Sequence, residues 1–323
     1  MKIVFLDVST IGEVPNMDEI KCLGEYAGYS FTANEQRIER LAGADVAITN
    51  KVVIDRETMT ACPCLQLICV AATGMNNIDL TCAAEKGITV RNVAGYSTNS
   101  VAQITFAMIL ELLVRTGGYN TYIQSGAYSA SPIFTHFGRP FWELAGKRFG
   151  IIGLGTIGKR VAAIAEAFGA EVCYYSTSGK NLNNPYKHLD INELLRTSDI
   201  VSIHAPLNDR THNLIGASQL RMMKPSALLI NVGRGGIVDE TALAGAIDAN
   251  LIAGAGLDVF TQEPLPSGHI LLTVRNKDKL LLLPHIAWAS IEARTVLISR
   301  IAENIKNFQK NKQNQRSFVK GNS

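Results

Sequence analysis

The sequence carries little net charge for its size. Its 323 residues contain 31 lysines and arginines against 28 aspartates and glutamates, a formal charge of +3. A balance this close to neutral argues against a dedicated nucleic-acid surface, which requires a strongly basic face. Since 47% of the residues are hydrophobic and 18% are charged, the chain has enough apolar side chains for a sizeable core. Its length predicts two domains.

Cysteine and long apolar runs are also scarce. Six cysteines are too few for a disulfide scaffold. The spacing of Cys62, Cys64 and Cys69 lacks the paired C-x2-C pattern of zinc sites, so we expect reduced thiols and no metal site. No stretch reaches the ~18 apolar residues that span a bilayer, and the first residues enter a strand without a cleavable leader. We therefore expect a cytoplasmic protein with no membrane partner.

Short apolar runs alternate with segments of helical period along most of the chain. Strands that are apolar throughout are typical of parallel sheets buried on both faces, and strand–helix alternation builds doubly wound α/β domains. We expect two such domains. The first set of predicted strands covers residues 3–8, 45–49, 67–70 and 88–91, and the second covers 149–152, 171–175, 199–203, 227–232, 254–259 and 280–283.

The predicted domain boundary lies near residue 98. Residues 100–114 are apolar on nearly every side, which predicts a helix buried at a domain junction or subunit interface. Residues 117–141 are rich in glycine, serine and aromatic residues and indicate an irregular arm. We expect a final helix over about 290–311, and we expect the polar, basic residues 309–323 to fray into solvent.

A glycine-rich motif follows the strand FGII and opens a helix. Gly153, Gly155 and Gly158 form G-x-G-x-x-G around Thr156 and Ile157. The first glycine permits a tight turn, the second lets a pyrophosphate approach the backbone, and the third lets the helix pack on the strand. The helix N-terminus offers unpaired N–H groups to phosphates. This context favours a dinucleotide site over a structural turn.

The end of the next strand determines which dinucleotide fits. An Asp or Glu about 20 residues after the motif binds the adenosine ribose hydroxyls. Here Ser176 lies 23 residues after Gly153, and Ser178 and Lys180 follow. Hydroxyls bond either a ribose hydroxyl or a phosphate, and Lys180 supplies a cation. These residues favour a site that tolerates a 2′-phosphate over a polar loop without a ligand.

Further candidate residues stand at the carboxyl ends of later strands, where ligands bind in open α/β sheets. His204-Ala205-Pro206 ends one such strand. Arg234 sits between glycines after Asn231-Val232-Gly233, where a planar guanidinium can hold a carboxylate and a keto oxygen. Asp258 ends a third strand, and Glu263 and His285 follow nearby. A carboxylate beside an imidazole orients it and favours its protonated form, as a proton donor for ketone reduction requires.

Together these motifs resemble the D-isomer-specific 2-hydroxyacid dehydrogenases over nearly the whole chain. The matching segments are GLGTIG at 153–158, NVGRGGIVD at 231–239, GAGLDVF at 254–260, EP at 263–264 and PHIAWAS at 284–290. The resemblance implies a flavodoxin-like substrate domain (1–98 plus 289–323) and a Rossmann dinucleotide-binding domain (99–288), with a cleft between them. It also implies that the long helix and the arm of the second domain form a homodimer.

The resemblance assigns roles residue by residue. The family's catalytic Arg, Glu and His fall on Arg234, Glu263 and His285, and its substrate-carboxylate loop falls on Thr73 and Gly74; Arg234 and His285 also contact the substrate. The implied cofactor contacts are Gly153, Gly155, Thr156, Ile157, Gly158, Ser176, Ser178, His204, Ala205, Pro206, Thr211, Asn231, Val232, Gly233, Arg234, Asp258, His285 and Ala287.

Within the family the chain looks most like glycerate dehydrogenases, also called hydroxypyruvate reductases, in the segments ITNKVVID, VAATGMNNID, GYSTNSVAQITFAMILEL and HIAWAS. This implies hydride transfer from NADH or NADPH to hydroxypyruvate, or to glyoxylate. Since Ser176 replaces the family's usual ribose-binding Asp, we expect both cofactors to be used. Three alternatives remain: phosphoglycerate oxidation, which requires extra cations; formate oxidation, disfavoured because those enzymes have Gln at the position of Glu263; and a dinucleotide-sensing corepressor of the same fold.

Overall fold

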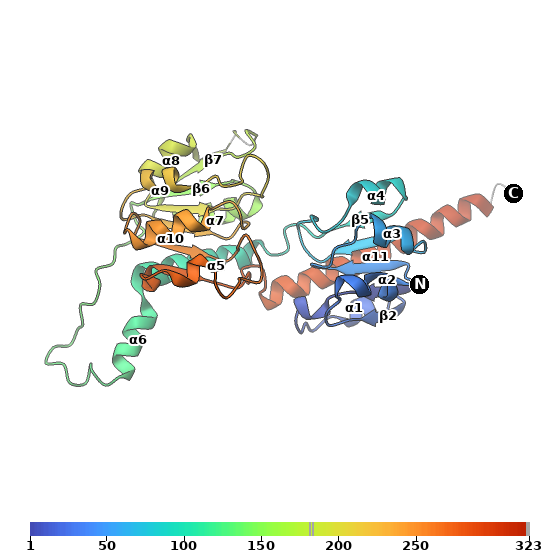
Figure 1. The fold of residues 1–323 in the computed structure, drawn as a ribbon, viewed down its shortest axis with the longest axis horizontal. Coiled ribbons are helices and arrows are strands. Elements are labelled where there is room, and N and C mark those ends of the chain that lie inside the picture. The colour runs from blue at the N-terminus through green and yellow to red at the C-terminus, as the bar shows by residue number, and fades with distance from the viewer. Residues whose placement is uncertain (181, 183, 321–323) are drawn as a thin grey trace. The chain divides into compact units, whose positions relative to one another are not determined.

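The computed structural model describes residues 1–180, 182 and 184–320. The chain forms two compact units (Figure 1). The first unit joins Met1–Ser97 to the segment that begins at Ala289, and the second unit is Thr98–Trp288. Each is built on one sheet in which every strand pair is parallel. The predicted fold class of two doubly wound parallel-sheet α/β units is confirmed.

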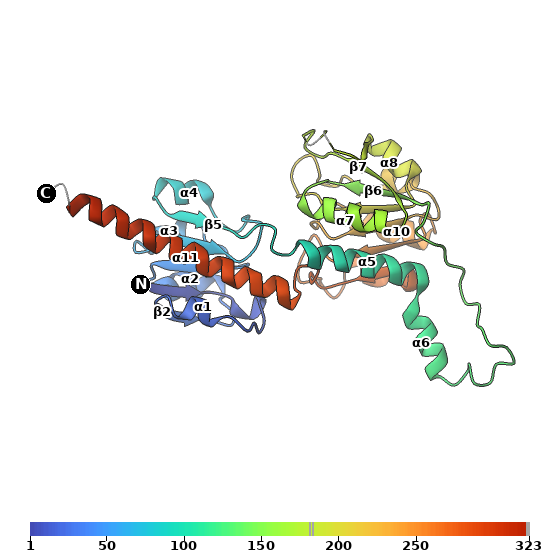
Figure 2. The ribbon, with the colours of Figure 1, turned by 180° about the vertical axis from the view of Figure 1, so that it is seen from behind.

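The first unit contains a five-stranded sheet of order β2-β1-β3-β4-β5, the flavodoxin-like order. Figure 2 shows the long helix α11 running along this unit. The strands are β1 (Lys2–Phe5), β2 (Glu25–Gly28), β3 (Val46–Thr49), β4 (Leu67–Val70) and β5 (Thr89–Arg91); the helices are α1 (Asp18–Lys21), α2 (Arg37–Leu41), α3 (Arg56–Ala61), α4 (Leu80–Glu85) and α11 (Ile291–Lys320), with short 3-10 turns η1 (Val8–Thr10) and η2 (Asn34–Gln36).

The second unit contains a seven-stranded sheet of order β12-β11-β10-β9-β6-β7-β8. The strand order reverses between β6 and β9, as in Rossmann folds. The strands are β6 (Arg148–Ile152), β7 (Glu171–Tyr175), β8 (Lys187–His188), β9 (Ile200–Ile203), β10 (Leu228–Asn231), β11 (Gly254–Leu257) and β12 (Leu280–Leu282); the helices are α5 (Thr98–Val114), α6 (Thr116–Gln124), α7 (Thr156–Ala167), α8 (Ile191–Thr197), α9 (Ala217–Met222) and α10 (Glu240–Asp248), with 3-10 turns η3 (Ile270–Thr273) and η4 (Lys277–Lys279).

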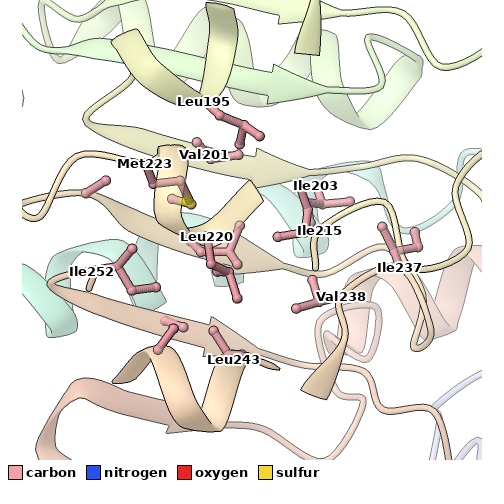
Figure 3. Close-up of a cluster of buried hydrophobic side chains, with 14 of the residues drawn as sticks. Leu195, Val201, Ile203, Ile215, Leu220, Met223, Ile237, Val238, Leu243 and Ile252 are labelled. Atoms are coloured by element: carbon pink, nitrogen blue, oxygen red, sulfur yellow. The ribbon is translucent and has the colours of Figure 1, made fainter. Parts of the chain in front are cut away.

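Apolar side chains cover both faces of the second sheet, which explains why its strands read as continuous apolar runs. One face packs against α8, α9 and α10, where Leu195, Leu220 and Leu243 meet the strands (Figure 3). The opposite face packs against α5 and α7 around Phe106 and Phe149, whose stacked rings have their centroids 5.9 Å apart. The rigid sheet fixes the positions of the loops that follow its strands.

The structure departs from the predicted elements in four places. The edge strands β2 and β8 were not predicted, because their residues are partly or fully exposed and form no apolar run. Residues 116–124 of the predicted irregular arm form helix α6. The first strand ends at Phe5, not at residue 8. The tail predicted to fray continues α11 as far as Lys320, and residues 321–323 lie outside the described part.

The helix α5 is only partly buried within the single chain, and its predicted burial at a subunit interface stays a prediction. Eight of its 17 residues are buried, whereas Gln103, Ala107 and Leu110 are exposed in the single chain. No single described helix is long and apolar enough to cross a membrane; only α5 and α6 taken together, bent by 57° at Arg115, have the length and composition. The packing of α5 against α7 and the sheet is that of a core helix.

Candidate cofactor and proton-transfer site

The glycine loop between β6 and α7 has the geometry of a phosphate-binding turn. Gly153 has φ +93°, and a Cβ there would lie 3.0 Å from the backbone of His204 and Ala205. A Cβ at Gly158 would lie 2.3 Å from the carbonyl oxygen of Gly153, so only glycine lets α7 begin this close to the strand. A Cβ at Gly155 would meet no atom within 4 Å. The N-terminus of α7 is therefore open to an anion.

Thr156 and Ile157 form the first turn of α7, with Thr156 exposed and Ile157 half-buried. Beside this turn lies a cavity of about 480 Å³ within the second unit. It lies where the strand order reverses, at the carboxyl ends of β6 and β9, which is where dinucleotides bind in such sheets. It is lined by Gly153, Leu154, Gly155, Tyr174, Ser176, Thr177, Ser178, His204, Pro206, Asn208, Asp209 and Arg210.

His204 contributes a neutral imidazole to the cavity wall. Its Nε2 lies 2.9 Å from Oγ of Ser202, and its buried Nδ1 has no hydrogen-bond partner among the described residues. Burial lowers the pKa of His204 to about 3, so the ring carries no charge at neutral pH. Since buried polar atoms are normally paired, the free Nδ1 is a hydrogen-bonding position left for a ligand. The glycine loop, the open helix end and this nitrogen fit a dinucleotide.

The turn after β7 presents hydroxyls to the same cavity. Ser176 donates its hydroxyl to the carbonyl of Lys180 at 2.6 Å, and the Lys180 amide donates to Oγ of Ser178 at 3.2 Å. Lys180, the cation expected from the sequence, is exposed and does not line the cavity; Arg210 lines it instead. Arg210 belongs to the loop after β9, and no sequence signal connects it to Ser178, which lies 32 residues earlier.

The loop after β9 is internally bonded. Thr211 is fully buried, and its hydroxyl donates to the carbonyl of Pro206 at 2.6 Å and accepts from the amide of Asn208 at 2.9 Å. Thr211 therefore shapes the loop, whereas Pro206 lines the cavity and Ala205 is buried behind it. Of the predicted cofactor residues in this loop, His204 and Pro206 stand on the cavity wall.

A second cluster lies at the carboxyl ends of β10, β11 and β12. Nδ1 of His285 lies 2.7 Å from Oε2 of Glu263, and Oε1 of Glu263 accepts from the amide of Phe260 at 3.0 Å. Both side chains are about one-quarter exposed. His285 has φ +55°, a left-handed conformation that costs a non-glycine residue on the order of 1–3 kcal/mol. With Nδ1 held by Glu263, Nε2 is the ring nitrogen that can exchange a proton with a ligand.

Asp258 fixes the backbone that follows His285. It is buried, and its two carboxylate oxygens accept from the amides of Ile286 at 2.8 Å and Ala287 at 2.9 Å. Burial raises the pKa of Asp258 despite the opposing effect of these hydrogen bonds and of the nearby His285. Ala287 is itself buried, and its carbonyl accepts from Oγ of Ser100. Asp258 thus holds the backbone of the loop that carries His285 by accepting these two amide hydrogen bonds.

Arg234 stands on the turn after β10. Asn231 holds this turn by donating Nδ2 to the carbonyl of Arg234 at 3.0 Å and accepting from the amide of Gly233 at 3.1 Å; Val232 and Gly233 are buried. The guanidinium is exposed and donates to the carbonyl of Gly233. A Cβ at Gly235 would lie 1.9 Å from the carbonyl oxygen of Phe260. This close approach places the Arg234 turn directly against the loop that carries Glu263.

Thr73 and Gly74 lie in the first unit, after β4. Oγ1 of Thr73 donates to the carbonyl of Val93 at 3.1 Å, and Nδ2 of Asn92 donates to the carbonyl of Thr73 at 2.6 Å. These bonds fix the loop through Thr73.

All six cysteines are free, and among the described residues no group of three or more His, Cys, Asp or Glu side chains is placed to hold a metal ion.

Comparison with known proteins identifies the family. Residues 106–287 match the family described as D-isomer specific 2-hydroxyacid dehydrogenase, NAD binding domain. Glycerate dehydrogenase from Methylorubrum extorquens is 38% identical over 308 residues, which cover 95% of this chain and 96% of that protein.

Two solved structures share the fold over nearly the whole chain. An acyclic imino acid reductase in complex with NADPH and D-Arg has a TM-score of 0.84 at 30% identity, covering 96% of this chain and 98% of that one. D-Lactate dehydrogenase from Aquifex aeolicus, complexed with NAD and lactic acid, has a TM-score of 0.80 at 28% identity, covering 97% of each chain. The chain belongs to the D-isomer-specific 2-hydroxyacid dehydrogenase family, and its second unit contains the family's NAD-binding domain.

Proposed function

We propose that this enzyme reduces hydroxypyruvate to D-glycerate, with glyoxylate as a smaller alternative substrate. The observation that carries the proposal is the Glu263–His285 pair, 2.7 Å apart, beside the Arg234 turn. Ketone reduction requires a proton donor and a cation that binds the substrate carboxylate, and this cluster offers both. The name of the Methylorubrum extorquens relative, glycerate dehydrogenase, supports this substrate, and the relatives named glyoxylate reductase support the smaller one.

The nicotinamide, when bound, supplies the hydride. His285 delivers the proton to the keto oxygen from Nε2, while Glu263 orients the ring through Nδ1. The planar fork of Arg234 binds the substrate carboxylate and polarises the ketone. We assign the amides of Thr73 and Gly74 to the same carboxylate.

We propose that both NAD and NADP serve as cofactor. The glycine loop of Gly153, Gly155 and Gly158 holds the pyrophosphate at the N-terminus of α7. The hydroxyl of Ser176, in place of a carboxylate, accepts from a ribose hydroxyl or donates to a phosphate oxygen. The solved relatives include one complex with NADPH and one with NAD.

We further propose a homodimer formed by α5, α6 and the rest of the arm, residues 125–141. In both views α6 and the arm extend away from the body of their unit (Figures 1 and 2). The arm exposes 89% of Phe134 and 86% of Phe137, and α6 exposes 53% of Ile123. Clustered exposed apolar side chains mark interaction surfaces. Light scattering of the purified protein is expected to give twice the 35.0 kDa chain mass.

We place the dimer in the cytoplasm, in keeping with its free thiols.

The direct test is turnover of NADH and NADPH with hydroxypyruvate, glyoxylate and phosphohydroxypyruvate as separate substrates, followed by chiral analysis of the product. We expect the highest kcat/KM with hydroxypyruvate and D-glycerate as the product. Preference for the phosphorylated acid would assign the enzyme to phosphoglycerate metabolism. Dinucleotide binding without turnover of any of the three acids would favour a corepressor-like binding protein.

A further inference from the structure

A cationic side chain reaches the hydroxyl-bearing turn of the cavity. Nη1 of Arg210 donates to the carbonyl of Ser178 at 3.3 Å, although the two residues come from different loops. The amide of Arg210 donates to Oδ1 of Asn208 at 3.0 Å. The buried hydroxyl of Thr211 closes the same loop. The loop therefore holds the backbone of Arg210 in place and directs its guanidinium toward the turn after β7.

Among the described residues that line the cavity, Arg210 is the cation. The residues that line it include two charged groups, Asp209 and Arg210, and the neutral ring of His204. In the part of the chain that the structure describes, only Arg210 of the two is bonded to the turn after β7. Ser176, Thr177 and Ser178 add hydroxyls at the same end of the cavity.

We infer that Arg210, with the hydroxyls of Ser176 and Ser178, forms a binding site for the 2′-phosphate of NADP(H). In Rossmann folds the turn after the second strand faces the adenosine ribose, and an arginine there accommodates a 2′-phosphate. A guanidinium binds phosphate oxygens through two parallel N–H bonds, and hydroxyls donate to the remaining oxygens. For Ser176 this means that its O–H exchanges the Lys180 carbonyl for a phosphate oxygen. The inference rests on the proposed dinucleotide site and goes beyond it by naming the group that selects the phosphorylated cofactor.

The test measures binding to the protein without turnover. The probes are adenosine 2′,5′-bisphosphate, which carries the 2′-phosphate, and 5′-AMP, which lacks it, each titrated calorimetrically. Arg210→Gln is expected to weaken binding of the bisphosphate about 10- to 100-fold, the loss typical of hydrogen bonds to a charged group, and to leave 5′-AMP within about twofold. Arg221→Gln, at an exposed arginine of α9, is the matched control and should change neither affinity.

Two results would overturn the inference. Equal affinities of wild type and Arg210→Gln for the bisphosphate would remove Arg210 from the site. Loss of 5′-AMP binding in Asp209→Asn, with Arg210→Gln unchanged, would assign ribose recognition to Asp209. Failure of the wild-type protein to bind either nucleotide would contradict the proposed dinucleotide site itself, and this outcome is distinct from the other two.

A second carboxylate–imidazole pair, less exposed than the first, lies next to the Glu263 loop. Glu240, the first residue of α10, is 8% exposed, and its Oε2 lies 3.0 Å from Nε2 of His269. Its Oε1 accepts from both the amide of Thr261 at 2.7 Å and the hydroxyl of Thr261 at 3.1 Å. Thr261 is two residues from Glu263, whose own carboxylate binds the amide of Phe260. The two adjacent amides at the start of the segment from Phe260 to Glu263 are thus both held by carboxylates.

From this network we also infer that Glu240 is a positioning residue for Glu263. It does not face the substrate; it holds the backbone from which Glu263 reaches His285. This inference rests on the proposed role of Glu263. Removing Glu240 leaves the Thr261 amide without its partner and frees the loop to shift, and a shift of about 1 Å at a catalytic group costs on the order of 100-fold in rate.

Glu240→Ala is expected to lower kcat 10- to 100-fold, scaled to the folded fraction, while KM for the cofactor stays within about twofold. His269→Gln keeps an N–H donor for Glu240 and should retain most of the rate. Thr261→Ser keeps both donors to Glu240 and serves as the conservative control. A Glu240→Ala protein that loses stability but keeps wild-type kcat per folded molecule would reduce Glu240 to a purely structural role and contradict the inference.

Discussion

Replacing Gly235 with alanine is expected to lower kcat/KM for 2-keto acid reduction about 100-fold without changing any group that reacts. The added Cβ would lie 1.9 Å from the carbonyl oxygen of Phe260 and 2.5 Å from the amide nitrogen of Thr261. Ordinary contact begins at 3.4 Å, so one of the two segments must retreat by about 1.5 Å. Because the Phe260 amide binds Glu263, and Glu263 binds His285, the displacement reaches the proton donor.

The size of this effect follows from the geometry of the two loops. A misplacement of about 1 Å costs on the order of 100-fold in rate, which corresponds to about 2.7 kcal/mol in the activation barrier. Steady-state kinetics with hydroxypyruvate measure the loss, and nucleotide titration checks that the cofactor cavity is intact. Gly268→Ala is the control, because a Cβ there meets no atom within 4 Å. A folded Gly235→Ala enzyme with wild-type kcat/KM would refute the coupling between the two loops.

Three further predictions concern single side chains. Arg234→Lys keeps the charge but loses the two-pronged geometry, so substrate affinity and turnover should both fall; full activity in steady-state assays would show that a point charge suffices. Ser176→Asp should lower kcat/KM for NADPH much more than for NADH at one ionic strength, and strict use of NADH by the wild type, unaltered in the variant, would mean that another position reads the ribose. Burial lowers the pKa of His204 to about 3 in the folded chain from 6.5, so the unfolded state takes up the extra proton and stability falls as pH drops below about 6.5. His204→Gln should therefore flatten the pH dependence of the unfolding free energy by up to about 1.4 kcal/mol per pH unit, measured by denaturant titration between neutral pH and about pH 5; an unaltered slope would contradict the buried neutral ring.

The central strands could be predicted from the sequence because burial on both faces makes them uniformly apolar. Residues 67–70 and 254–257 read as strands for this reason, and the structure contains both. The edge strand β2 could not be predicted, since its residues are half-buried or exposed and carry no periodic apolar signal. The helical tail was mistaken for frayed chain because its polar residues lack an apolar face, although lysine, glutamine and arginine favour helices.

Residues of the candidate site could be predicted where they directly follow a strand. They could not be predicted where only the folding of distant loops brings them into contact with the site. Glu263 and His285 were expected as a pair from their chemistry, and they lie in hydrogen-bond contact. In the sequence, Arg210 is one charged residue in a polar loop and carries no signal of a ligand site. Its contact with Ser178 could not be predicted because it depends on the order of β6, β7 and β9 in the sheet. Glu240 reads as an acidic residue favourable at a helix N-terminus, and its bonds to Thr261 depend on loop packing that periodicity does not encode.

The turnover of His285→Asn, measured with hydroxypyruvate at saturating cofactor, tests the proposed chemistry most directly. Asparagine cannot hold the proton that the imidazole delivers, so kcat should fall by roughly 10²–10⁴. Cofactor affinity, measured by nucleotide fluorescence, should stay near that of the wild type, because the glycine loop is unaltered. A variant with near-wild-type kcat would contradict the role of His285 as the proton donor.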